Sequence, residues 1–186
     1  MAAHKQEIYL SIIVSVYNEE EVLQAFWTEM NRVLQQAGWL EKAEVIFVND
    51  GSADRSRQII DRLATENAPV RGIHFSRNFG HEAAMISGID HASGQWIVCL
   101  DSDLQHPPAH IPEMVRAAEQ GYDIVLMQRE ERADKRGLNQ LFSRAFYRLL
   151  NLLSPAEFAH NSSDFFLISR KVAAVLKSHF RERTRF

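Results

Sequence analysis

Residues 8–26, IYLSIIVSVYNEEEVLQAF, set the pattern that much of the chain repeats. Apolar and β-branched residues dominate up to Tyr17, which is typical of a strand buried on both faces of a parallel sheet. The polar letters NEEE follow at once, and from Val22 onward apolar residues return at helical spacing. Asn18 is interpreted as the cap of this helix and Gly38 as its end. The stretch therefore predicts a buried strand, a polar turn and an amphipathic helix.

The same alternation recurs along the chain. Further strands are predicted at residues 43–50, 70–76, 95–101 and 122–128, with helices at 54–67, 82–91 and 108–121. Asp54 is interpreted as the cap of the second helix. This order predicts an α/β fold with a mostly parallel, doubly wound sheet flanked by helices. The remainder predicts an apolar helix at 138–154, then a turn, a short strand and a helix over 161–178.

Composition narrows the class of protein. The 186 residues are 46% hydrophobic and 24% charged, with a net charge of −3, which fits a soluble single domain spanning 1–186 and argues against a general nucleic-acid binder. Cys99 is the single cysteine, so no internal disulfide can form and a reducing compartment is favoured. Residues 1–10, MAAHKQEIYL, lack the apolar core that is typical of a signal peptide, and no run approaches the ~18 apolar residues of a membrane span.

Polar residues follow each predicted strand. Doubly wound sheets bind ligands beyond the carboxyl ends of their strands, so these residues are expected to share one site. Candidates after the first three strands are Glu19, Asp50 and Arg77. Asp50 could accept a hydrogen bond from a nucleobase, although Asp-Gly is also typical of a plain turn. Arg77 could contact a phosphate beside a helix N-terminus.

The stretch LDSDLQHPP, residues 100–108, places two carboxylates at the end of the fourth strand. In an extended backbone Asp101 and Asp103 point to one side, with Gln105 on the same parity and Ser102 opposite. Paired carboxylates and an amide oxygen suit Mg²⁺ or Mn²⁺, although a bare Asp-x-Asp is also typical of turns and helix caps.

Basic residues gather after the fifth strand. In QREERADKR they include Arg129 and Arg132, which indicate either a clamp on phosphate groups or a solvated loop. Other chemistries lack their motifs: the chain has no Gly-x-Gly-x-x-Gly after the first strand, no phosphate-binding Walker loop and no Gly-x-Ser-x-Gly elbow.

Together these motifs resemble an inverting nucleotide-sugar glycosyltransferase of the GT-A fold. The resemblance rests on SIIVSVYNEEEVL, EVIFVNDGSADRS, FSRNFGHEAAMISGI, GQWIVCLDSDLQHPPAHIPEMV and GYDIVLMQREER. The forms DLQHPP and SRAFYRLLN are similar to the polyprenyl-phosphate glycosyltransferases, which include dolichyl-phosphate mannose synthase and undecaprenyl-phosphate transferases. The resemblance implies a hexosyltransferase that moves a sugar from a UDP- or GDP-sugar to a polyprenyl phosphate.

The resemblance also implies residue roles. Asp101, Asp103 and Gln105 would hold Mg²⁺ or Mn²⁺ against the donor diphosphate, with Asp103 and Asp164 as the catalytic residues. Asp164 would orient or assist the acceptor. The nucleotide-sugar would be contacted by Tyr17, Asn18, Glu19, Asp50, Arg77, Asp101, Ser102, Arg129 and Arg132.

One segment departs from the family pattern. Where members often read DTGDFRL, this chain reads NSSDFFL, so Asn161, Ser163 and Phe166 replace an acid, a glycine and an arginine. The changes at Asn161 and Phe166 leave open a non-lipid glycan acceptor. A noncatalytic nucleotide-sugar-binding module is a further alternative, and the intact Asp101, Asp103 and Gln105 argue against it.

The lipid acceptor implies a location. We expect a catalytic part that acts at the cytoplasmic face of a membrane, attached through C-terminal interfacial and transmembrane helices that follow residue 186. The apolar residues of 138–154 predict a partly exposed face that lipid or those segments cover, and through which the chain could form a homo-oligomer.

Overall fold

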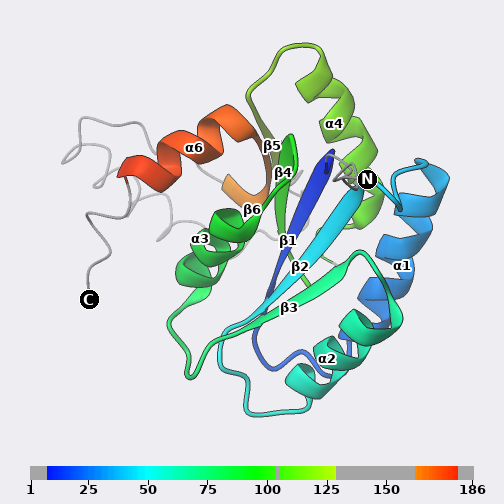
Figure 1. Ribbon diagram of the computed structural model, residues 1–186, viewed down its shortest axis with the longest axis vertical. Helices are drawn as coiled ribbons and strands as arrows, with labels where there is room; N and C mark the ends of the chain where they lie inside the picture. The colour runs from blue at the N-terminus through cyan, green and yellow to red at the C-terminus, as the bar shows by residue number, and fades with distance from the viewer. Residues whose placement is uncertain (1–7, 104, 129–161, 180–186) are drawn as a thin grey trace, which may run out of the picture. The chain divides into compact units, whose positions relative to one another are not determined.

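The computed structural model describes residues 8–103, 105–128 and 162–179. Strands and helices alternate through most of this part of the chain (Figure 1). The elements are β1 (Leu10–Val16), α1 (Leu23–Gln36), β2 (Ala43–Asn49), α2 (Ser56–Glu66), β3 (Val70–His74), α3 (His81–His91), β4 (Trp96–Asp101), η1 (Pro108–His110), α4 (Ile111–Glu119), β5 (Ile124–Gln128), β6 (Ser162–Ser169) and α6 (Arg170–His179).

The strands form a six-stranded mixed sheet in the order β3-β2-β1-β4-β6-β5. β1 pairs in parallel with β2 and with β4, and β2 pairs in parallel with β3, as the sequence predicts. β6 runs antiparallel to β4. The strand order changes direction between β1 and β4, and such switch points are where doubly wound sheets leave a crevice for ligands.

Helices cover both faces of the sheet. In Figure 1, α3 and α6 lie on one side, while α1, α2 and α4 lie on the other. α1 contributes Phe26, whose ring meets Phe47 of β2 edge to face at 6.0 Å. The cluster on the α3 side is apolar and buried, and it consists of Ile13, Ile46, Val48, Ala84, Met85, Ile89, Ala92, Ile97, Cys99, Ile168 and Ala173. Burial on both faces explains why the central strands are nearly continuous apolar runs.

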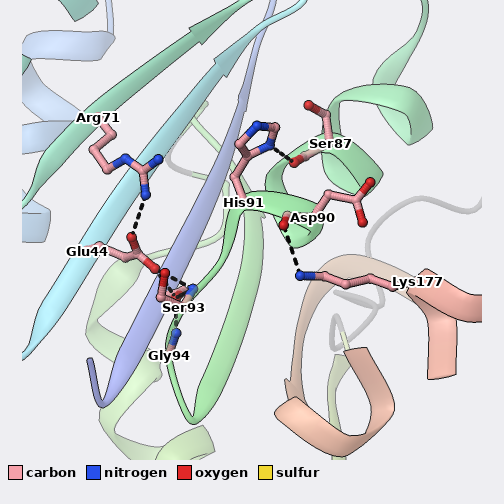
Figure 2. Close-up of polar contacts among 9 residues, drawn as sticks. Glu44, Arg71, Ser87, Asp90, His91, Ser93, Gly94 and Lys177 are labelled. Carbon is pink, nitrogen blue, oxygen red and sulfur yellow. Dashed lines mark hydrogen bonds and ion pairs between the residues drawn. The ribbon is translucent and has the colours of Figure 1, made fainter. Parts of the chain in front are cut away.

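A buried carboxylate joins the amino ends of the central strands. Glu44, 6% exposed, accepts hydrogen bonds from the Ser11 hydroxyl at 2.6 Å, the Ser93 N–H at 2.6 Å and the Arg71 guanidinium at 2.9 Å. Figure 2 shows Glu44 between Arg71 and Ser93. The Gly94 N–H donates to Ser11 Oγ at 2.7 Å. These bonds tie the chain that enters β4 to β1 and β2, and so support the register that carries Asp101 to the opposite edge.

The start of α1 differs from the prediction. Asn18 does not cap this helix, which begins at Leu23 after Val22. Asn18 has a positive φ of 57°, and its side chain accepts a hydrogen bond from the Ala53 N–H across the edge of the sheet. A tertiary contact has replaced the local cap. The predicted end at Gly38 is confirmed, since α1 stops at Gln36 and Gly38 has φ +68°.

Contacts divide the chain into two compact units, residues 1–125 with 164–186, and residues 126–163. The predicted helix at 138–154 lies outside the described residues. Among the described helices, none is long and apolar enough to cross a membrane. The cavity described next belongs to the first unit.

Candidate functional site

A cavity of about 270 Å³ opens at the carboxyl ends of β1 and β4, at the switch point of the sheet. Its wall contains six predicted site residues and three that the sequence did not single out. The predicted ones are Tyr17, Glu19, Asp50, Asp101, Ser102 and Asp103, and the others are Ser15, Asn78 and His81. Four segments of the sequence, the turns after β1, β2, β3 and β4, are therefore brought together.

The turns after β1 and β2 hold each other in place. The Asn18 N–H donates to Ser52 Oγ and the Ala53 N–H donates to Asn18 Oδ1, both at 2.9 Å. The Glu19 N–H donates to Ser56 Oγ at 2.9 Å. The Asn18 side chain is thus bonded to the neighbouring turn, and Asn18 is absent from the cavity wall. These bonds fix the backbone of Glu19 beside the cavity.

Asp54 lies directly before α2, but the prediction that it caps this helix was wrong, because Arg55 occupies the N-cap position. Asp54 accepts the Ser56 N–H on one oxygen at 2.9 Å and the Glu20 N–H on the other at 3.0 Å. Burial opposes the charged form, but the hydrogen bonds from Ser56 and Glu20 prevail and lower the pKa of Asp54 below its usual range.

Asp50 anchors the loop between β3 and α3. It is 2% exposed, and its two oxygens accept the Phe79 N–H at 2.7 Å and the Gly80 N–H at 2.9 Å. Gly51 has φ +66°, and a Cβ placed on it would lie 2.2 Å from the carbonyl carbon of Arg77. The loop therefore reaches the cavity only because residue 51 has no side chain.

The loop carries Arg77 away from the wall. Its guanidinium lies over the exposed Phe79 ring, 4.7 Å from the centroid, and Arg77 is absent from the cavity lining. Asn78 is the loop residue that lines the cavity. The Arg77 side chain, three positions before Gly80, is therefore carried away from the cavity by the shape of the turn, which the sequence pattern does not reveal.

The Asp101–Asp103 stretch bends at the cavity, whereas the prediction assumed an extended backbone. β4 ends at Asp101, and the chain bends at once. In the bend, Asp103 Oδ1 accepts the Gln105 N–H at 2.9 Å. Asp101, Ser102 and Asp103 all line the cavity, and Ser102 is buried while the two aspartates are partly exposed. Strict alternation of sides applies only while the backbone stays extended.

Ser102 is 1% exposed, and its hydroxyl has no hydrogen-bond partner among the residues that the structure describes. Buried hydroxyls in native proteins nearly always have one, because an unmade bond costs about 1–3 kcal/mol. An unpartnered polar atom in a cavity wall is typical of a site that awaits a polar ligand.

Carboxylates crowd the cavity. Burial raises the pKa of Glu19 above its usual range, and the nearby charges of Asp103, Asp101 and Asp54 raise it further. The described residues include no group of three or more His, Cys, Asp or Glu side chains that could hold a metal alone. A cation beside Asp101 and Asp103 would therefore need further oxygens from a ligand or water, which is how Mg²⁺ commonly binds with phosphates.

The raised pKa predicts a pH dependence of stability. Because folded Glu19 binds its proton more tightly than the unfolded chain does, its contribution to stability falls as pH rises from about 4.5 through the raised folded pKa. Glu19→Gln should remove this fall and make the protein more stable than wild type at neutral pH in EDTA. Urea unfolding at several pH values measures the difference. A difference that does not change with pH would contradict the assignment.

The remaining predicted residues lie elsewhere. Gln105 is exposed and is absent from the cavity wall. Arg129 and Arg132 lie outside the described residues. Asp164 lies in β6, and its side chain is outside the described part. Among the three residues missed, His81 had the clearest signal, because it follows a glycine and begins a helix at the ligand edge.

Comparison with known proteins identifies the family. Residues 11–176 match the model of glycosyl transferase family 2. The chain is 38% identical over 172 residues to an uncharacterized glycosyltransferase, YkcC, of Bacillus subtilis, covering 92% of this chain and 53% of that protein. It is 36% identical over 168 residues to the bactoprenol glucosyl transferase of Shigella phage SfV, covering 90% and 54%. The chain thus spans about half the length of these curated relatives.

A solved structure supports the fold. The mannosyltransferase PcManGT from Pyrobaculum calidifontis, in complex with GDP-Man and Mn²⁺, aligns with a TM-score of 0.60 at 18% identity, covering 90% of this chain and 46% of that one. The predicted GT-A fold is therefore confirmed. From the sheet, its switch-point cavity and the match over residues 11–176, the chain belongs to glycosyl transferase family 2.

Proposed function

We propose that this chain is the catalytic part of a metal-dependent, inverting glycosyltransferase that moves a hexose from a UDP- or GDP-sugar to a polyprenyl phosphate. The observation that carries the proposal is the cavity at the β1/β4 switch point, where Asp101, Ser102 and Asp103 face Glu19 and Asp50. The relative named a bactoprenol glucosyl transferase supports a lipid acceptor.

The residues present fit a divalent cation. Burial and, after it, the charges of Asp103 and Asp101 raise the pKa of Glu19, and a bound cation would relieve the repulsion among these carboxylates. Asp101 and Asp103 offer the oxygen ligands that Mg²⁺ and Mn²⁺ prefer. When bound, the ion neutralises charge that develops on the departing nucleoside diphosphate. The neighbour in complex with GDP-Man and Mn²⁺ supports a cation in this role. Gln105 completes the set only if its exposed side chain turns inward.

The other walls suit the donor. Tyr17 is half-exposed at the cavity and offers a ring face to a base. Asp50 holds two backbone N–H groups, and a carboxylate keeps acceptor capacity for a further N–H from a nucleobase. The unpartnered Ser102 hydroxyl can donate to a ribose or phosphate oxygen. Arg77, Arg129 and Arg132 remain candidates for phosphate contacts outside this wall.

The acceptor chemistry needs little proton transfer. An acceptor phosphate oxygen forms the bond to the anomeric carbon as the bond to the diphosphate breaks, which inverts that centre. A phosphate monoester has a second pKa near ~6, so it is largely ionised at neutral pH and needs no strong base. Residues on the acceptor side therefore orient the nucleophile.

The pairing of β4 with β6 supports such a role for Asp164. Cys99 of β4 lies opposite Phe166 of β6 in the antiparallel register. Asp101 lies two residues after Cys99 and Asp164 two residues before Phe166, so this pairing, if continued along both strands, supports a place for residue 164 near Asp101. Phe166 is partly buried against the apolar cluster under α3 and α6, so this position supplies no cation for an acceptor phosphate.

Asp164→Asn should lower kcat about 10-fold or more while the KM for the donor changes little, because an orienting contact counts most in the transition state. Steady-state kinetics with the donor and acceptor varied in turn measures the split. Equal activity per folded molecule, accompanied only by lower stability, would leave Asp164 with a turn or capping role.

A transfer assay tests the whole proposal. Labelled UDP-glucose and GDP-mannose are each incubated with Mn²⁺, with and without undecaprenyl phosphate, and products are separated into lipid and aqueous phases. We expect label in the lipid phase that depends on both Mn²⁺ and the acceptor. Transfer only to soluble glycans would mean that the acceptor is a glycan and not a lipid phosphate. Donor binding without any transfer would favour a noncatalytic binding module.

The proposal includes a membrane setting. The acceptor is a long-chain lipid, so the active site must work near the cytoplasmic face of a bilayer. Co-sedimentation of the protein with vesicles, with and without anionic lipid, tests this setting. Self-association through residues 138–154 stays a prediction, because those residues lie outside the described part of the chain.

A further inference from the structure

One side chain bridges the two strands that border the switch point. Ser15 of β1 and Asp101 of β4 are direct partners in the parallel register. Both lie on the same parity as Ile13, Ile97 and Cys99, which pack against α3. His81 is the first residue of α3, and its Nδ1 lies 3.1 Å from Ser15 Oγ and 3.3 Å from Asp101 Oδ1. The ring therefore covers this cross-strand pair at the cavity edge.

The chemistry of His81, Ser15 and Asp101 indicates which ring nitrogen of His81 carries a hydrogen. A carboxylate only accepts hydrogen bonds, so contact with Asp101 requires a hydrogen on Nδ1 of His81. Ser15, which is buried, can accept a share of the same N–H. The two acceptors on neighbouring strands hold the ring in one orientation, and the ring in turn restricts rotation of the Asp101 carboxylate.

Asp50, another residue of the cavity wall, fixes the position of His81. Asp50 accepts the N–H groups of Phe79 and Gly80, the two residues that precede α3. Those bonds fix where α3 begins, and so where His81 stands. A connected path thus runs from the carboxyl end of β2, through the loop, to the carboxylate at the end of β4.

We propose that His81 is a positioning residue that orients Asp101 for the divalent cation. The inference rests on the proposed function, since it concerns the same metal and nucleotide. Carboxylate ligands are commonly held by a second hydrogen-bonded group, whose loss lowers metal affinity by about 10- to 100-fold. The His81 side chain is 37% exposed, so its removal opens a rim and leaves the apolar core intact.

The test compares His81→Ala with His81→Asn. Asparagine places an N–H donor close to the position of Nδ1 without the ring, so it should restore what alanine loses. The matched control is His91→Ala, at the other end of α3, where Nδ1 donates to the Ser87 carbonyl at 2.8 Å, away from the cavity (Figure 2). Mn²⁺ affinity is measured by electron paramagnetic resonance in the presence of UDP or GDP, and nucleotide affinity is measured separately in EDTA.

We expect His81→Ala to weaken Mn²⁺ binding about 10- to 100-fold, with His81→Asn and His91→Ala within about 3-fold of wild type. Nucleotide affinity in EDTA should be unchanged in all three variants, which a general structural defect would not produce. Wild-type Mn²⁺ affinity in His81→Ala, or equal loss in His81→Asn, would overturn the role assigned to His81. If the wild-type protein itself binds neither nucleotide with Mn²⁺, the proposed function fails, and this inference fails with it.

Discussion

Asp103→Asn is expected to lower metal-dependent glycosyl transfer by about 10³-fold. The variant keeps the shape of the side chain and an oxygen that can accept the Gln105 N–H, but it removes one negative charge from the cavity. A contact with a metal ion contributes several kcal/mol to transition-state stabilisation. Because about 1.4 kcal/mol of activation free energy changes the rate tenfold, the loss of about 4 kcal/mol gives this magnitude. Initial rates over a range of Mn²⁺ concentrations measure the loss.

Two comparisons make the Asp103 result specific. Asp123→Asn changes an exposed aspartate that is absent from the cavity wall, and it should leave transfer unchanged. Nucleotide affinity should fall in Mn²⁺ but stay the same in EDTA. If the Asp103→Asn protein kept both its activity and its response to Mn²⁺, Asp103 would have no part in metal binding. Its only role would then be structural, as the acceptor of the Gln105 N–H in the turn.

Gly51→Ala is expected to lower the free energy of unfolding by about 3–5 kcal/mol. A side chain at φ +66° carries a conformational cost of about 1–2 kcal/mol, and the new Cβ would also lie within 2.6 Å of three backbone atoms of Arg77 and Asn78. Backbone cannot move aside as a flexible side chain can. The loop must therefore shift and weaken the Asp50 hydrogen bonds. Urea denaturation measures the loss.

Gly38→Ala is the matched control. Gly38 has almost the same conformation, with φ +68°, but nothing lies within 4 Å of an added Cβ. It should lose only the conformational part, about 1–2 kcal/mol, and keep donor binding. Equal losses in the two variants would mean that the close approach of the loop contributes nothing.

Most of the fold followed from local patterns. The apolar runs of β1, β2 and β4 predicted strands buried on both faces, and the helical spacing of apolar residues predicted α1, α2 and α4. The helix and short strand predicted after residue 161 correspond to α6 and β6. The antiparallel direction of β6, and its place beside β4, did not follow, because an isolated run of eight residues carries no information about its partner.

The candidate site was only partly predictable. Strand order placed Glu19, Asp50, Asp101 and Asp103 at one edge, and the structure brings all four to the same cavity. The prediction that Asn18 caps α1 was wrong because a backbone N–H from another turn competes for its side chain. The bend directly after Asp101 was not predicted, because a strand rule was extended past the last strand residue.

The sequence by itself determined which residues form strands and helices, and therefore which polar side chains stand at the carboxyl edge of the sheet. It could do so because hydrophobic periodicity is local and reflects the face that each element buries. The tertiary structure alone decided that Ser15 faces Asp101, that His81 lies over both, and that Asp50 holds the loop before α3. Those contacts join residues 20 to 86 positions apart, and they depend on strand register, which a buried carboxylate at the opposite edge helps to hold.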